Sequence, residues 1–119
     1  MADLNGDGTL DVVVNNLLSP AQVFENRLCG GSSLEVELRW PQSRNTRALG
    51  ARLVLETSAG RYDRDVRASS GYLSGDPMTV QFGLPPGATP EQLSIRWPDG
   101  MVSRVAGLQA QTRLTVTRR

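Results

Sequence analysis

The chain has 119 residues, 39% of them hydrophobic, which suits one folded domain with a core of its own. Its 13 basic and 12 acidic residues give a formal net charge of +1, which excludes a general electrostatic attraction to nucleic acid or anionic lipid. There is no histidine and Cys29 is the only cysteine, so an internal disulfide, a CxxC metal or redox site and the usual general base of hydrolases are all excluded.

The first 26 residues are predicted to form a polar loop followed by two short strands, over residues 10–14 and 22–25. Two parts are expected, residues 1–26 and residues 27–119. The join between them, residues 27–33, holds Cys29 beside two glycines and is expected to be a flexible elbow. Cys29 is either a small semi-buried side chain or one half of an intermolecular disulfide.

The rest of the chain consists of short runs in which apolar and polar residues alternate. A period of two places one set of side chains on a core and the other in water, which is typical of β-strands. The runs cover residues 34–40, 51–56, 62–68, 78–84, 93–97 and 114–117. Turn-forming residues separate them, and Pro98 and Gly100 predict a tight hairpin over residues 97–101.

No window has the apolar stripe of a helix, apart from one short helical turn that residues 90–92 would allow. Several strands at this spacing indicate an all-β fold, and we predict an antiparallel β-sandwich that follows the short N-terminal loop and strands. The residues expected in its core include Trp40, Leu53, Phe82, Ile95 and Trp97.

One segment carries a pattern typical of metal binding. Between residues 3 and 11, oxygen-bearing residues recur at alternate positions, and Gly8 stands where the chain must turn sharply. Ca²⁺ is a hard cation that takes about six to eight oxygen ligands, which a tight loop of this kind can supply. The predicted Ca²⁺ ligands are the side chains of Asp3, Asn5, Asp7 and Asp11 and the backbone carbonyl of Thr9. The alternative is an Asp/Asn/Gly-rich turn that binds no metal.

Residues 3–16 resemble the calcium loop and following strand of an FG-GAP (VCBS) repeat of β-propellers, and residues 24–27 resemble the strand that commonly closes such an array. The remainder resembles the ASPIC/UnbV domain, which follows these repeats in many secreted proteins. The matching segments are residues 43–45, 49–53, 70–74, 81–84 and 95–100. Many members of that family have a histidine immediately before the phenylalanine at position 82, where this chain has Gln81.

Enzyme chemistry is not expected. The serines lie in loops without a histidine partner, so a hydrolase triad is missing. Asp63 and Asp65 share the parity of a solvent-facing strand surface, and Asp76 and Asp99 lie in turns, where aspartate is favoured for local hydrogen bonding. We therefore expect none of these carboxylates to work as an acid–base pair.

Tyr72 lies between small residues in a loop and is a candidate for stacking on a ligand. The alternative is a tyrosine corner, in which the ring lies on the edge of the sandwich and the hydroxyl bonds to the backbone. Several arginines between residues 44 and 67 share this region with Glu56, Asp63 and Asp65, so mixed ion pairs are expected there rather than a basic face.

These features predict an extracellular calcium-binding module for adhesion or assembly. We expect a protein partner or self-association through the N-terminal strand, which would build a filament, and no nucleic-acid partner and no membrane span. The alternative is an accessory domain of a propeller protein that binds a ligand such as carbohydrate. Residues 1–16 are too acidic and polar for a secretion signal, so we expect a mature or excised piece of a longer protein.

Overall fold

A computed structural model describes residues 1–27 and 31–119 of the chain. Nine strands are found in this described part, and no helix. Accordingly, none of the described residues forms a helix of the length and apolarity that crossing a membrane requires. Cys29 and the centre of the expected elbow lie outside the described residues.

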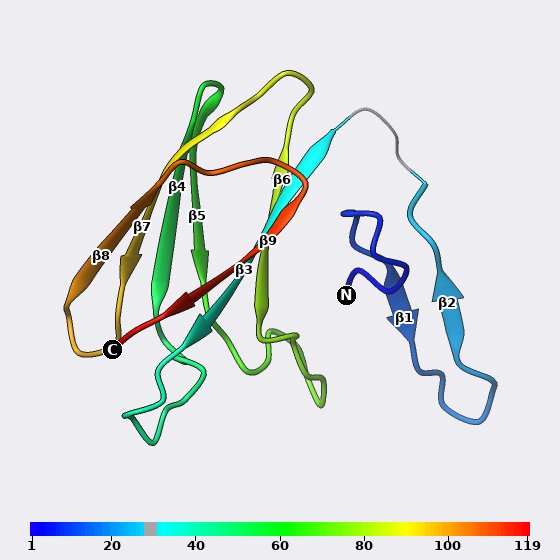
Figure 1. Cartoon of the computed structure of the whole chain (residues 1–119). Coiled ribbons are helices and arrows are strands. Elements are labelled where there is room, and N and C mark those ends of the chain that lie inside the picture. The colour runs from blue at the N-terminus through cyan, green and yellow to red at the C-terminus, as the bar shows by residue number, and fades with distance from the viewer. Residues whose placement is uncertain (28–30) are drawn as a thin grey trace.

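The strands form a small N-terminal hairpin and two larger sheets (Figure 1). The hairpin pairs β1 (Val12–Val14) with β2 (Gln22–Phe24). The first larger sheet has the order β6–β3–β9, with β3 at Ser32–Arg39, β6 at Thr79–Leu84 and β9 at Thr112–Thr117. The second has the order β5–β4–β7–β8, with β4 at Arg52–Thr57, β5 at Gly60–Asp65, β7 at Pro90–Arg96 and β8 at Val102–Ala106.

The two larger sheets pack face to face, which confirms the predicted all-β sandwich. Alternate residues of the inner strands supply the core, as the period of two requires. The largest buried side chains are Trp97, Phe82, Leu34, Leu38, Leu53, Leu55, Leu93 and Ile95. Four of the five predicted core residues are therefore buried, whereas Trp40 is only partly buried and packs against the edge of the core.

Three details differ from the sequence-based prediction. The pairing of β3 with β9 is parallel, because the chain crosses from β8 in one sheet to β9 in the other before it runs beside β3. Residues 90–92 open β7 instead of forming a helical turn, and Pro90 pairs with Thr57 at an irregularity in the ladder. β8 was not predicted as a strand, because its inward positions include the polar Ser103 and the alternation is weak.

Ion pairs cover the outer surface as expected. Asp63 on β5 accepts hydrogen bonds from Arg52 at 2.5 Å and from Arg61 at 3.4 Å. Asp65 pairs with Arg67 at 3.1 Å. These side chains are exposed, so each pair contributes little stability. The expectation of mixed ion pairs rather than a basic face is confirmed here.

Candidate functional site

The N-terminal loop folds around the carboxylate of Asp3. Its two oxygens accept the backbone amides of Gly6, Asp7 and Gly8 at 2.7, 3.2 and 2.9 Å. Gly6 and Gly8 have φ of +78° and +88°, a left-handed conformation that favours glycine. The loop therefore turns at Gly8, as the sequence predicted.

The next two polar side chains bond within the same loop. Asp7 accepts the amide of Thr9 at 2.8 Å and its hydroxyl at 2.7 Å, and these bonds, the hydroxyl first, lower the pKa of the Asp7 carboxyl. The Asn5 side chain donates to Asp7 at 2.9 Å and accepts the Asp7 amide at 3.0 Å. These contacts keep Asp7 ionised to lower pH than an ordinary aspartate.

Asp11 is only 2% exposed, and backbone amides satisfy its charge. It accepts Leu4 N–H at 2.9 Å and Asn26 N–H, also at 2.9 Å. It also pairs through its backbone with Ala2. Asp11 thus ties the loop to the end of the hairpin, which explains why a carboxylate can be buried at the start of β1.

The five predicted calcium ligands therefore lie in one compact loop, and their chemistry fits a hard cation because every donor is an oxygen. Each carboxylate oxygen that accepts one amide keeps a second lone pair. Within the described residues, no three acidic or cysteine side chains converge around a single point. Binding of Ca²⁺ would therefore require side chains of the loop to rearrange, including the mutually bonded Asn5 and Asp7.

The loop rests on the outer face of the sheet β6–β3–β9. The Gln81 side chain on β6 donates to the carbonyl of Gly8 at 2.5 Å. Ser33 points outward from β3 yet is only 5% exposed. A Cβ on Gly8 would meet the Ser33 hydroxyl at 2.6 Å, so any other residue here would force that side chain or the loop to shift. Sequence reasoning noticed Gln81 only as a departure from a family pattern and did not foresee this contact.

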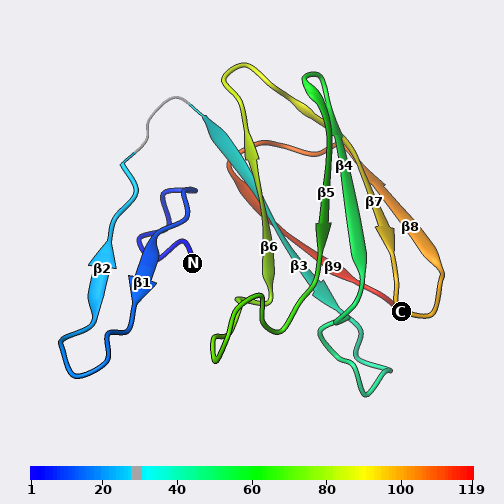
Figure 2. The same ribbon diagram turned by 180° about the vertical axis from the view of Figure 1, so that it is seen from behind.

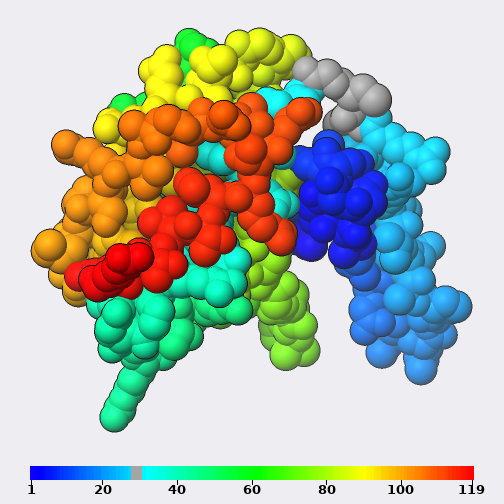
Figure 3. All heavy atoms as spheres, viewed as in Figure 1, coloured from blue at the N-terminus to red at the C-terminus, as the bar shows by residue number. Residues whose placement is uncertain are grey.

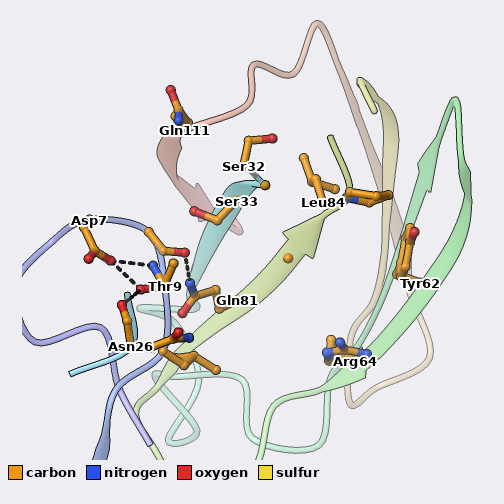
Figure 4. Close-up of a pocket in the computed structure, with 15 residues that line it drawn as sticks. Asp7, Thr9, Asn26, Ser32, Ser33, Tyr62, Arg64, Gln81, Leu84 and Gln111 are labelled. Atoms are coloured by element: carbon orange, nitrogen blue, oxygen red, sulfur yellow. Dashed lines mark hydrogen bonds between the residues drawn. The ribbon is translucent and has the colours of Figure 1, made fainter. Parts of the chain in front are cut away.

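A cleft of about 590 Å³ opens beside this contact, between the loop and the sandwich. Figure 4 shows Asp7, Thr9 and Asn26 on one wall and Tyr62 and Arg64 of β5 on the other. Between them lie Ser32, Ser33 and Gln81. No sequence pattern pointed to this site, because its residues come from five stretches that are far apart in the chain: residues 7–10, 26–33, 62–64, 81–85 and 111.

The sequence model of the ASPIC and UnbV family matches residues 41–119, well over half of the chain. This chain belongs to the ASPIC and UnbV family. No curated protein matches it at a significant level. The matched range covers β4 to β9 and leaves out β3, which lies at the centre of one sheet. The ASPIC and UnbV match therefore does not extend to the N-terminal loop, and the FG-GAP resemblance stays a prediction.

One distinctive segment of this ASPIC and UnbV domain, residues 70–74, forms a projecting loop. Tyr72 is 93% exposed and Leu73 is 90% exposed, with φ of +52° at Leu73. The tyrosine corner, which the sequence left open as an alternative, is wrong, since a ring so exposed does not pack on the edge of the sandwich. Tyr72 lies outside the cleft, so it does not share a site with Gln81 and Tyr62.

Proposed function

We propose that this ASPIC and UnbV chain is an extracellular, non-enzymatic structural module in which Ca²⁺ stiffens the junction between the N-terminal hairpin and the sandwich. The observation that carries this proposal is the hydrogen bond from Gln81 to the Gly8 carbonyl. It joins the oxygen-rich loop to the domain through a backbone atom of the loop itself. Whatever fixes the loop therefore also fixes the hairpin against the sandwich.

Ca²⁺ is the cation that suits such a loop. Asp3, Asp7 and Asp11 would supply negative charge, while Asn5 and the Thr9 carbonyl would supply neutral oxygens. Three carboxylates crowded into nine residues repel one another, and a divalent cation removes that repulsion. Mg²⁺ suits the site less well because it keeps its waters and demands strict octahedral geometry.

Calorimetry and thermal melting in calcium and in EDTA test the proposal. Binding to the folded state stabilises by RT ln(1 + [L]/Kd), so millimolar Ca²⁺ adds roughly 1–3 kcal/mol even at a weak site. Asp7→Asn should remove most of this gain. Asp65→Asn, which changes an exposed carboxylate of β5, serves as the matched control and should keep it. No binding heat together with identical melting in EDTA would refute the calcium proposal.

A role in adhesion or assembly is supported by the exposure of the hairpin. Val13, Val23 and Phe24 are 51%, 64% and 53% exposed, and β1 and β2 pair only with each other among the described strands. Unpaired strand edges with apolar side chains invite pairing with another chain. A protein partner or a second copy of this chain would cover them.

The second candidate function is that of an accessory ligand-binding domain. The cleft beside Gln81 favours it, because its volume falls in the usual range of about 300–1,000 Å³ for small-molecule sites. This reading does not depend on calcium. It requires a ligand whose chemistry matches the cleft walls.

A further inference from the structure

The cleft lies where the two sheets meet at an open edge. β5 and β6 are the edge strands of their sheets and run side by side, as Figure 2 shows. The N-terminal segment stands beside that edge (Figure 3). The cleft therefore has one wall from the sandwich and one wall from the N-terminal loop.

At Gly83, the floor of the cleft carries no side chain. Gly83 lies on the outward parity of β6, opposite Ser33 of β3, and a Cβ built on it would meet no atom within 4 Å. The backbone of β6 is thus open to the cleft over the space between Gln81 and Leu84. A ligand can approach the strand closely there.

The cleft walls are rich in neutral hydrogen-bonding groups. Hydroxyls come from Ser32, Ser33, Thr9 and Tyr62, and side-chain amides come from Gln81, Asn26 and Gln111. A hydroxyl both donates and accepts, and an amide offers both kinds of group. Such a lining pairs best with a ligand whose own groups also donate and accept, which describes the hydroxyls of a sugar.

Charge on the walls argues against an ionic ligand. The lining includes one carboxylate, Asp7, and one guanidinium, Arg64, from opposite sides. Arg64 lies over the Phe82 ring with its central carbon 5.8 Å from the ring centre, and it donates to the Asp63 carbonyl. An anion would be repelled by Asp7 and a cation by Arg64, so neither kind of ion gains net electrostatic binding energy over a neutral molecule.

Tyr62 adds an aromatic surface to the same wall. It is half-buried, and its Cα is paired with that of Leu55 of β4, which holds the ring at the sandwich edge. A partly exposed aromatic ring with a hydroxyl presents an apolar face and a polar tip to one ligand. Sugars carry both C–H faces and hydroxyls and match that combination.

We propose that the cleft between the N-terminal loop and strands β5 and β6 binds a neutral saccharide of one or two rings. Hydroxyl and amide groups of Ser32, Gln81 and Gln111 bind its hydroxyls, and Tyr62 contacts a ring face. This deepens the ligand-binding function proposed above, and it stands apart from calcium binding.

The test is an NMR titration of the ¹⁵N-labelled chain with glucose, galactose, mannose, N-acetylglucosamine and lactose, each up to high millimolar concentration. At least one sugar should shift the amides of Ser32, Gln81 and Gly83 in a saturable manner. Gly83→Leu should weaken that binding by about tenfold or more, because the new side chain fills the cleft floor. Thr115→Leu, an outward change on β9 away from the cleft, should bind as the parent does.

Gly83→Leu is expected to fold, since a Cβ at this exposed position meets no atom within 4 Å and glycine is unfavourable within a strand. Titrations in calcium and in EDTA separate the two proposals, because sugar shifts that persist in EDTA support the cleft whether or not calcium binds. Alanine and inorganic phosphate are added as zwitterionic and anionic probes. Shifts with either of them and with no sugar, or equal sugar binding by Gly83→Leu, would overturn the proposal.

Discussion

The Arg118 guanidinium donates two hydrogen bonds to the Asp99 carboxylate, at 2.7 and 2.6 Å. Its central carbon lies 4.3 Å from the centre of the Trp40 ring. Trp40 meets Trp97 edge-on with ring centres 6.0 Å apart. The contact joins the C-terminal residues to the turn between β7 and β8, which lie together in Figure 1. A bidentate pair with its arginine stacked on a ring holds its geometry better than an ion pair with a single contact.

This contact predicts an acid-dependent contribution to stability. The hydrogen bond from Arg118 lowers the pKa of Asp99 in the folded state. As the pH falls below about 4, the unfolded state takes up its proton first, so the contribution is present above that pH and lost below it. Arg118→Ala should lower the melting midpoint by several degrees at pH 7, with a smaller difference at pH 3. Arg119→Ala, the neighbouring exposed arginine, should change neither value.

The core prediction concerns Phe82, which is fully buried between the sheets. Phe82→Ala leaves a cavity and should reduce the free energy of unfolding by about 3–5 kcal/mol, a large part of the total for a domain of this size. Leu73→Ala, at a site 90% exposed, should change it by less than about 0.5 kcal/mol. Denaturant unfolding measures both. A Phe82→Ala variant with the parent's midpoint would show that the sheets do not pack as described.

Much of the sandwich follows from local pattern. Leu34, Val36 and Leu38 alternate with glutamates, and this alternation is enough to predict β3 and its buried face. The sequence pattern did not predict β8, because the polar Ser103 occupies an inward position. There its hydroxyl accepts a hydrogen bond from the indole N–H of Trp97 at 2.8 Å. The sequence pattern also did not predict that β9 pairs in parallel with β3. The relative direction of two strands depends on how distant segments meet in space, and the alternation of apolar and polar residues carries no information about it.

The candidate site was only half predictable. A run of alternating oxygens over residues 3–11 is a local pattern, so the loop was found from sequence. The cleft depends on Tyr62, Gln81 and Ser33, which come together only when the sheets pack and the loop docks. For Tyr72 the sequence left both ligand stacking and a tyrosine corner open, and only the packing of the loop shows that the ring is exposed.

The docking of the loop predicts different effects for two glycines. Gly6 and Gly8 both have positive φ, so alanine is strained at either position. Only at Gly8 would the new methyl group also meet the Ser33 hydroxyl, at 2.6 Å. Gly8→Ala should therefore weaken the hydrogen bond from Gln81 and increase amide hydrogen exchange of residues 1–14 relative to the sandwich. Gly6→Ala should leave the exchange of the Gln81 and Ser33 amides unchanged. Equal exchange patterns in the two variants would contradict the docking.

The last prediction concerns self-association through the hairpin. β1 and β2 pair with each other and add to neither larger sheet, so each retains an unpaired edge in the described structure. An isolated pair of strands is marginal in water, and its exposed valines and Phe24 favour a third strand. A strand supplied by a second copy of the chain would make a head-to-tail contact. When repeated contacts of this kind do not close into a ring, they build an open fibre.

The chain lacking residues 1–26 should stay monomeric by light scattering, whereas the full chain should form larger particles in calcium, visible by electron microscopy. Val13→Lys should suppress assembly while leaving the sandwich intact, because lysine on an edge strand opposes pairing. Arg104→Lys, a change on the exposed face of β8, should assemble as the parent does. A full chain that remains a monodisperse monomer at high concentration in calcium would rule out assembly, and the exposed hairpin would then call for a different protein partner.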